Sequence, residues 1–381
     1  MLDLAFTDEQ EMLREVVRTV LAEHAPLSVV RAMEDDAVGY PADLWRRFAD
    51  LDLLGLLLPE EHGGSGMTLL EGVVLYEEMG RALTPVPHFV SCVASGGAIA
   101  AGGTPEQRAA WLPRIAAGDA VLTPAWLEPD GGFGPGGVRV RATTADGGET
   151  WTITGTKRHV GFAAAATRLL VFARTGDGAG DVDLFLVDPG APGVSLTQHL
   201  TIASDTQYRV DLDGVRVEAA DRLGAPGTGW ATWEAVRDEA LVLLAAWAVG
   251  AADRTQEMTV QYAKDREQFG KPIGAFQAIA HYLADRQTEL DGARTLVHEA
   301  AWAHAAGRPA TRLAPMAKLF ATRMLRSLTA TAQQVYGGNG FTLEYDVQLY
   351  FRRAKALQIS WWAPRDLEDM IAADVLDGRK P

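Results

Sequence analysis

Two separated stretches of the chain carry residue types suited to binding a flat or anionic group. In residues 333–341, QQVYGGNGF, three glycines follow a helix-like run from Met324 to Val335. In residues 265–273, DREQFGKPI, an arginine ends a helical pattern, and Gln277 follows early in the next helix. Glycine ends a helix and lets backbone N–H groups approach a ligand closely, and a guanidinium suits phosphate. The two stretches predict a site for a pyrophosphate with an attached adenosine.

Either stretch taken singly also fits an ordinary helix end, because a glycine cluster is a weak signal. Taken together they resemble the acyl-CoA dehydrogenase family, which carries R-E-x-F-G-K-x-I…F-Q and Q-x-x-G-G-x-G-[FY] in its C-terminal domain. The resemblance implies that these elements hold the ADP half of an FAD bound chiefly by the neighbouring subunit of a dimer. The residues it assigns to the cofactor are Arg266, Gln268, Phe269, Gln277, Gln334, Gly337 and Gly338.

The composition limits the class of protein and its partners. A chain of 381 residues is long enough for two or three domains, and 48% hydrophobic residues support a large core. The net charge of −15 argues against nucleic acid or an anionic membrane surface as a partner. A single cysteine, Cys92, leaves no intrachain disulfide and no thiol cluster for a metal. Without a signal peptide or a long apolar run, we expect a cytoplasmic protein without membrane insertion.

Hydrophobic periodicity divides the chain into three predicted domains, 1–119, 120–223 and 224–381. The first reads as helical, with a capping-box pattern at 7–10 and a loop of helix breakers at 58–66. The second has a period of two in runs at 138–143, 151–154, 169–172, 183–187 and 208–212, which predicts a small antiparallel barrel or sandwich. The third has long helical patterns at 230–263, 275–306, 310–335 and 345–357, which predict an antiparallel four-helix bundle. This α+β multidomain order is the architecture of the family, and the resemblance covers essentially the whole chain.

The family's reaction needs a carboxylate that takes the α-proton of an acyl thioester, and such a base contributes about 10²–10⁴-fold. Aligned on Ala354-Lys355, the commoner position of this glutamate is Trp361. The alternative position, counted back from Arg266, is Ala240, followed by Leu241. The resemblance therefore leaves both base positions empty, and we predict no catalytic residue in this chain.

Several acidic side chains lie near the two empty base positions. Glu239 is one residue away from Ala240, which turns it by about 100° on a helix, so we expect a solvated or paired surface glutamate. Asp366, Glu368 and Asp369 read as the charged face of a terminal helix.

The residues aligned with the family's flavin-ring contacts also differ. The motif x-T-E-P-x-x-G-S-D reads WLEPDGGFG at 126–134, so Glu128-Pro129 is kept while Leu127, Phe133 and Gly134 replace the contact residues. In G-x-K-x-W-I-[TS]-N, read as GTKRHVGF at 155–162, the tryptophan is His159 and the hydroxyl residue is Gly161. We expect His159 to fill the space of the tryptophan. The alternative is that it acts as a new acid or base.

The family residues that are replaced are those at the base positions and at the flavin ring, whereas the residues that would contact a partner's cofactor are kept. The favoured hypothesis is a non-catalytic subunit of a heteromeric (α2β2) acyl-CoA dehydrogenase, which completes the FAD site of a catalytic partner subunit. Its substrate would be an acyl-CoA, possibly bulky like a sterol side chain, and its electron acceptor an electron-transfer flavoprotein. One alternative is a self-sufficient flavoenzyme of the same fold, a monooxygenase or oxidase. The other is a cofactor-free structural protein.

Overall fold

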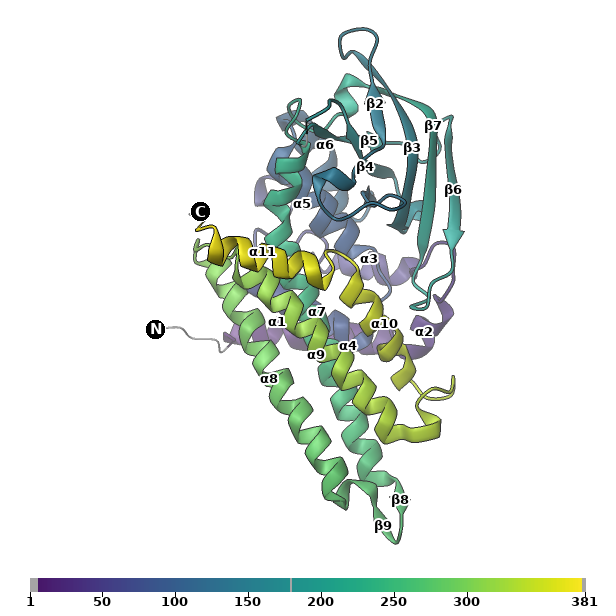
Figure 1. Ribbon diagram of the computed structural model, residues 1–381, viewed down its shortest axis with the longest axis vertical. Coiled ribbons are helices and arrows are strands. Elements are labelled where there is room, and N and C mark those ends of the chain that lie inside the picture. Colours follow the sequence, from purple (N-terminus) through teal and green to yellow (C-terminus); the bar gives the residue numbers. More distant parts are fainter. Residues whose placement is uncertain (1–5, 179, 379–381) are drawn as a thin grey trace. The chain divides into compact units, whose positions relative to one another are not determined.

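The computed structural model describes residues 6–178 and 180–378, and these form two compact units (Figure 1). The helical unit contains the described residues of Met1–Val30, Thr68–Thr84 and Leu241–Pro381. The mixed unit contains Arg31–Met67 and Pro85–Ala240. The predicted N-terminal domain is divided between the two units. Its helices α1 (Asp8–His24) and α4 (Leu69–Ala82) belong to the helical unit, because α4 packs with α1 and with α8 (Gln277–Ala305). The boundaries at 119/120 and 223/224 stay a prediction.

The helices of the helical unit have the local signals expected from the sequence. Thr7 and Gln10 form the predicted capping box at the start of α1, and Thr68 forms another with Glu71 at the start of α4. The C-terminal part of the chain is the predicted helical bundle, which confirms the predicted fold class. Its helices are α7 (Gly229–Asp265, of which 241–265 belong to this unit), α8, α9 (Leu313–Tyr336), α10 (Val347–Ile359) and α11 (Pro364–Leu376). The helix predicted from 275 begins at Gln277, because Ile273–Ala275 form a 3-10 turn.

Buried charges on α4 tie this unit together. The Glu78 carboxylate accepts hydrogen bonds from Arg18 Nε and Nη2 at 2.9 and 2.6 Å, and Glu77 is 2.8 Å from His298. Arg81 donates to Asp253 on α7. Both glutamates are buried, so their partners offset the cost of removing the charges from water. The contacts join α1, α7 and α8 to α4.

The mixed unit is built on one seven-stranded sheet with the order β1-β4-β2-β3-β7-β6, in which β5 also pairs with β4. The strands are β1 (Leu122–Ala125), β2 (Arg141–Thr143), β3 (Thr150–Gly161), β4 (Arg168–Arg174), β5 (Val182–Val187), β6 (Val194–His199) and β7 (Gln207–Glu218). Most pairs are antiparallel as predicted, but β1 runs parallel to β4, which corrects the expectation of a purely antiparallel sheet. The period-two pattern does not predict β1, whose Pro124 is tolerated because β1 is an edge strand.

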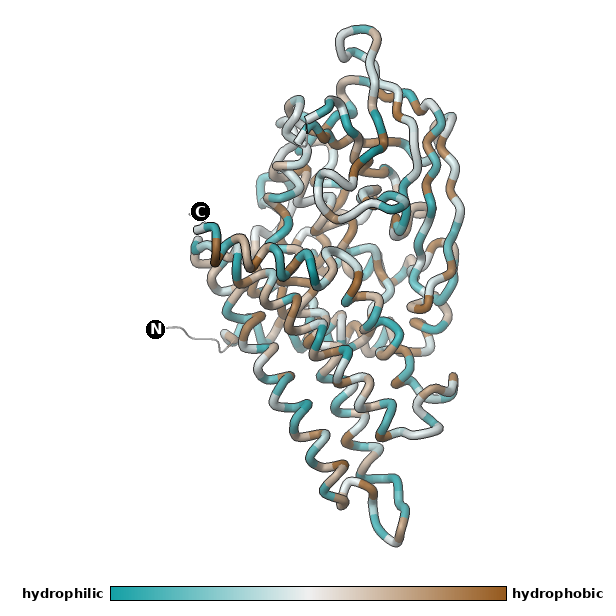
Figure 2. Tube along the Cα trace, in the orientation of Figure 1, coloured by the Kyte–Doolittle hydropathy of each residue, from teal (hydrophilic) through white to brown (hydrophobic). Residues whose placement is uncertain are grey.

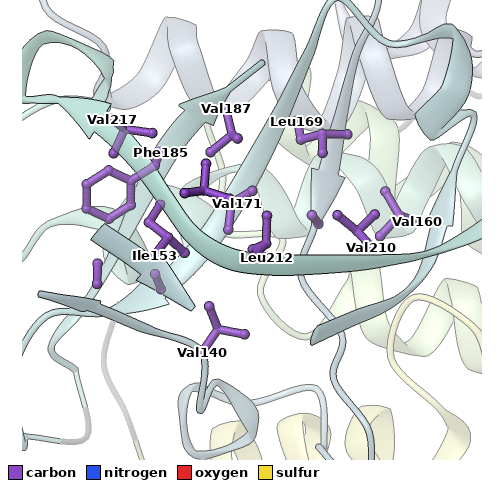
Figure 3. Packing of buried hydrophobic residues seen from close by; sticks show 14 of the residues in the cluster. Val140, Ile153, Val160, Leu169, Val171, Phe185, Val187, Val210, Leu212 and Val217 are labelled. Carbon is purple, nitrogen blue, oxygen red and sulfur yellow. The ribbon is translucent and has the colours of Figure 1, made fainter. Parts of the chain in front are cut away.

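One hydrophobic core of the mixed unit lies on one face of this sheet, although β4 and β5 are buried on both faces. Ile153, Val171, Phe185 and Val210 are each fully buried and point toward one another from β3, β4, β5 and β7 (Figure 3). Burial of such side chains stabilises the fold by roughly 1.5–3 kcal/mol each. The remaining helices of the unit are α3 (Ala42–Asp50), α5 (Gly96–Gly102) and α6 (Pro105–Ala116), with a π-helical segment at Phe89–Ser95.

Hydrophobic and hydrophilic residues alternate along α8 and α9, as Figure 2 shows. This alternation fits helices that pack on one side and face water on the other. Within the described ranges, no helix has both the length and the apolar character needed to cross a membrane.

Candidate cofactor-binding surface

The fold brings the two sequence motifs to one end of the helical bundle. The end of α7, the hairpin of β8 (Glu267–Gln268) and β9 (Lys271–Pro272), the start of α8 and the end of α9 meet there. Figure 1 shows the hairpin beyond the ends of α7 and α8. A small apolar cluster holds these segments together, and its members are Ala263, Leu283 and Val335 with Val260, Tyr262, Ile273 and Ile279. The motifs are about 65 residues apart in the sequence, so this juxtaposition is a property of the tertiary structure.

The tip of the hairpin is a strained turn that displays an aromatic ring. Gln268 pairs with Lys271, so Phe269 and Gly270 form a two-residue loop, and both have positive φ, 55° and 81°. This conformation suits Asn-Gly and costs a bulky residue free energy. Nevertheless Phe269 occupies the first position, with 92% of its surface exposed. The ring meets Phe276 edge-on, with centroids 6.2 Å apart, and most of its surface faces solvent.

The variant Phe269→Asn is expected to weaken ligand binding without lowering the stability of the chain. Asparagine fits the turn better, so the melting temperature of the chain should stay unchanged or rise. Loss of the ring should weaken binding of an adenine-containing ligand about tenfold, since a ring contact is worth about 1–3 kcal/mol. Isothermal titration of the assembled protein with FAD and differential scanning fluorimetry measure the two effects. A variant that binds as well as the parent would show that the ring has no ligand.

Arg266 is fixed at its backbone and exposed at its side chain. Its N–H donates to the carbonyl of Tyr262 at 2.9 Å, and its carbonyl accepts from Ile273 at 2.8 Å. The residue is exposed, and no carboxylate of the described chain lies within ion-pair distance of its guanidinium. The backbone therefore fixes where the side chain begins, and the guanidinium has no protein anion beside it, which leaves it available to an external phosphate.

The three glycines after α9 have different surroundings. Gly337 ends the helix as predicted, with φ 59° and ψ −134°, a conformation that other residues rarely adopt. A Cβ on Gly340 would lie 2.7 Å from Gln333 Oε1 and 3.0 Å from the Gln333 carbonyl oxygen, so a larger residue there would crowd α9. A Cβ on Gly338 would meet nothing within 4 Å, and its φ is not positive. Nothing within this chain demands glycine at 338, so the open backbone there fits close approach by a ligand.

The remaining predicted cofactor residues are also exposed. Gln277 is the first residue of α8, where free backbone N–H groups favour an anion. Gln334 lies in the last turn of α9, and Gln268 donates its side-chain amide to the carbonyl of Glu267 at 2.7 Å. All seven predicted residues are thus on the surface.

The loop aligned with the commoner base position has an unusual backbone and a buried lysine behind it. Trp361 and Trp362 have positive φ, 52° and 70°, and Trp362 is buried. Lys318 donates to the carbonyls of Ser360 and Trp362, each at 2.9 Å, and its side chain is fully buried. Burial lowers the pKa of Lys318 to about 7, while Asp366 acts in the opposite direction. The two hydrogen bonds that Lys318 donates to these carbonyls hold the loop in this conformation.

The acidic residues beyond this loop have structural partners. Asp366 accepts the backbone N–H of Ala363 at 3.1 Å and so caps α11, and Glu368 pairs with Arg323. Both lie on the predicted terminal helix, in the roles of a cap and a surface ion pair.

Glu239 differs from the expectation of a solvated or paired surface glutamate. Ala240 and Leu241 in α7 are buried, and the neighbouring Glu239 is half-buried, not solvated. Burial raises the pKa of its carboxyl to about 7, and no other cause contributes. A rotation of about 100° does not carry Glu239 into solvent, because neighbouring residues on both sides of α7 are buried as well.

The raised pKa of Glu239 predicts a pH-dependent gain from Glu239→Gln. Its folded pKa of about 7 exceeds the ordinary value of 4.5, so between these values the folded chain binds more protons than the unfolded chain. Ionised Glu239 consequently lowers stability as the pH rises through this window. Glutamine should raise the free energy of unfolding by about 1–3 kcal/mol at pH 8 and change it little at pH 4.5. Thermal melts at both pH values measure this, and an equal effect at both would contradict the assignment.

The residues aligned with flavin-ring contacts lie in the mixed unit. His159 is exposed, and its place in the space of the tryptophan stays a prediction. It lies at an irregularity between β3 and β7 with φ 56°, is exposed, and has Nδ1 2.8 Å from Gln207 Oε1. The bulge turns its side chain outward, which the sequence pattern does not reveal.

The retained Glu128 has a structural partner. Its carboxylate accepts from Lys157 Nζ at 2.6 Å and from the N–H groups of Arg139 and Val140. Lys157 is fully buried, and burial lowers its pKa to about 8 although Glu128 favours the charged form. The pair fixes the loop between Glu128 and Arg139 to β3, which explains why both residues are needed without any ligand.

Comparisons with known proteins agree with this architecture. The family models of the N-terminal, middle and C-terminal domains of acyl-CoA dehydrogenase match residues 7–119, 124–224 and 227–360. The chain belongs to the acyl-CoA dehydrogenase family. It is 34% identical over 368 residues to the probable acyl-CoA dehydrogenase YngJ of Bacillus subtilis, covering 94% of this chain and 95% of the relative.

Two similar solved structures are described by pairs of protein names, ChsE4-ChsE5 and Tcur3481-Tcur3483. The ChsE4-ChsE5 complex from Mycobacterium tuberculosis is 29% identical with a TM-score of 0.88, over all of both chains. The Tcur3481-Tcur3483 steroid ACAD G363A variant is 33% identical with a TM-score of 0.86, over 97% of this chain and 98% of that one.

FAD is the cofactor that the acyl-CoA dehydrogenase family implies. The exposed Arg266, the displayed Phe269 and the open backbone at Gly338 fit the phosphates and the flat ring of its ADP half.

Proposed function

We propose that this chain is a non-catalytic subunit of a heteromeric acyl-CoA dehydrogenase. The observation that carries the proposal is the exposure of all seven cofactor residues at one end of the helical unit, ready for a cofactor seated on another subunit. Arg266 would bind the pyrophosphate, Phe269 would contact the adenine, and the backbone around Gly338 would lie against the cofactor. FAD, when bound, supplies the acceptor for the hydride. This chain's residues orient it and shield it from water.

The proposal assigns the chemistry to the partner subunit. Trp361 and Ala240 occupy the two positions where the family places its carboxylate, and neither can take a proton. The catalytic partner would bind the acyl-CoA and remove its α-proton, and an electron-transfer flavoprotein would accept the electrons. The solved complexes of unlike chains, one described as a steroid ACAD, support a heterotetramer and a bulky substrate such as a sterol side chain. We place the complex in the cytoplasm.

A second candidate is a self-sufficient flavoenzyme with altered chemistry, such as an oxidase or monooxygenase. The observation that favours it is Glu239, whose half-buried carboxyl has a pKa near 7 and thus suits proton transfer at neutral pH. In a heteromer, Glu239→Gln should leave turnover nearly unchanged. A loss of two orders of magnitude or more with FAD still bound would favour the second candidate.

The test of the proposed function compares the chain alone with the chain purified together with its partner. Alone, the chain should retain little FAD and should not oxidise any acyl-CoA with an artificial electron acceptor. The co-purified complex should contain a second acyl-CoA dehydrogenase chain with the glutamate in place, bound FAD and activity. Stoichiometric FAD and acyl-CoA turnover in the isolated chain would refute the proposal.

A further inference from the structure

Three tyrosines and an asparagine lie directly beneath the candidate cofactor surface, and no step described so far uses them. Tyr262 of α7 stacks on Tyr336, the last residue of α9, with ring centroids 4.0 Å apart and an angle of 12° between the planes. Tyr345 meets both rings edge-on, at 5.7 Å from Tyr336 and 6.2 Å from Tyr262. All three are only half-buried, so packing of an apolar core alone does not explain the arrangement.

Hydrogen bonds from this group end on the glycine turn. Asn339, within the turn, donates its side-chain amide to the hydroxyl oxygens of Tyr262 and Tyr345 at 3.1 and 3.2 Å. The Tyr262 hydroxyl donates to the carbonyl of Tyr336 at 3.4 Å, and that carbonyl belongs to the peptide leading into Gly337. The Tyr336 hydroxyl donates to the carbonyl of Met258 at 3.2 Å. Burial raises the pKa of Tyr336 to about 12, so the hydroxyl keeps its proton at neutral pH.

Tyr262 also contacts the other cofactor segment. Its backbone carbonyl accepts the N–H of Arg266, one helical turn further on. The same residue is therefore bonded through its backbone to the arginine and through its side chain to the glycine turn. A turn with three glycines among residues 337–340 would otherwise have many accessible conformations, because glycine has the greatest backbone freedom.

We propose that Tyr262, Tyr336, Asn339 and Tyr345, here called the tyrosine cluster, are positioning residues that fix Arg266 and the Gly337–Gly340 turn in one arrangement before a cofactor binds. The inference rests on the proposed function, since it concerns the same surface. Its consequence is preorganisation, because a surface that is already ordered loses less entropy when it binds the ADP half of FAD. The tyrosine cluster contacts no reacting atom.

Two variants and one matched control test the tyrosine cluster. Tyr262→Phe removes the hydroxyl that joins Asn339 to the Tyr336 carbonyl, and Asn339→Ala removes the amide from the other side. Tyr282→Phe is the control, because Tyr282 is an exposed tyrosine of α8 whose hydroxyl bonds to nothing in the described parts of the chain. Hydrogen exchange of the Gly340 and Thr342 amides, which bond to the carbonyls of Gly337 and Asn339, reports the order of the turn in the cofactor-free chain.

Each variant should raise the exchange rates of these amides and weaken FAD binding by the complex about tenfold, the effect of losing one hydrogen bond. The double variant should be little worse than either single one, because both remove one connected network. At saturating FAD the turnover number should match the parent, which distinguishes positioning from general damage. The control should behave like the parent in every assay.

The outcomes separate this inference from the proposed function. Unchanged exchange rates in Tyr262→Phe and Asn339→Ala would overturn the tyrosine cluster, even in a complex that loses FAD on substitution of Arg266. Faster exchange with weaker FAD binding would support both. A third outcome is faster exchange in a chain whose complex never holds FAD. It would support the structural role of the tyrosine cluster in ordering the turn. It would also refute the proposed function, and with it the role of the cluster toward the cofactor.

Discussion

Replacing Arg266 with alanine is expected to weaken FAD binding by the complex about ten- to a hundredfold, since a hydrogen bond to a charged group is worth about 1.5–3 kcal/mol. The effect should be large because the backbone of Arg266 is fixed by hydrogen bonds, and no carboxylate of the described chain competes with a phosphate for its guanidinium. It should also be specific. An exposed side chain without partners contributes little to folding, so the melting temperature of the variant should not change.

Lys264→Ala is the matched control for Arg266→Ala. Lys264 is an exposed cation in the last turn of α7, two residues before Arg266, so its loss removes the same charge from the same end of the helix without removing the planar donor group. Titration with FAD at two salt concentrations should show a small, salt-dependent effect for Lys264 and a large one for Arg266. Equal losses in the two variants would mean that only overall charge matters, and the assignment of a phosphate contact to Arg266 would be wrong.

Glu128→Gln is expected to destabilise the mixed unit by about 1–2 kcal/mol at pH 7, because Lys157, with a folded pKa of about 8, can lose its proton at a cost of about 1.4 kcal/mol when its partner is removed. Lys157 is fully buried and has Glu128 as its ion-pair partner at 2.6 Å. Its folded pKa of about 8 lies below the ordinary 10.5, so the unfolded chain binds the proton more tightly, and stability from this group rises with pH across that window. In the variant the pKa should fall further, so the loss should be smaller at pH 9 than at pH 7.

Chemical denaturation of parent and variant at both pH values measures this effect, and two further variants sharpen it. Glu149→Gln removes an exposed glutamate from the same unit and should change stability by less than about 0.5 kcal/mol. The double variant Glu128→Gln with Lys157→Met should recover much of the loss, because no buried charge remains. A loss that is independent of pH, or that Lys157→Met does not relieve, would show that Glu128 acts mainly through its bonds to the backbone.

The sequence predicted correctly those features that depend on neighbours along the chain. The capping box at Thr7, the end of α9 at Gly337 and the long helices of the bundle follow from local hydrogen bonds and from apolar periodicity. The family resemblance supplied the order of helical and β regions, which the comparisons and the structure confirm. The assignment of the seven cofactor residues remains a prediction.

Errors arose where the surroundings of a side chain depend on distant segments. The period-two pattern could not show that β1 pairs parallel with β4, because strand direction depends on the path of the chain between them. It could not show that a bulge turns His159 toward solvent. Helical geometry gave the angle between Glu239 and Ala240, but not the protein that covers both.

By itself the sequence determined the family, the helices and turns of the cofactor segments, and the identity of Trp361 and Ala240 at the two base positions. Only the tertiary structure decided that Arg266, Phe269 and Gly338 share one exposed end of the bundle. Only the tertiary structure showed that Glu128 forms a buried ion pair with Lys157. The physical reason is the range of the interactions. Caps and helical periodicity act over about four residues, whereas packing joins segments of the chain that lie far apart in the sequence.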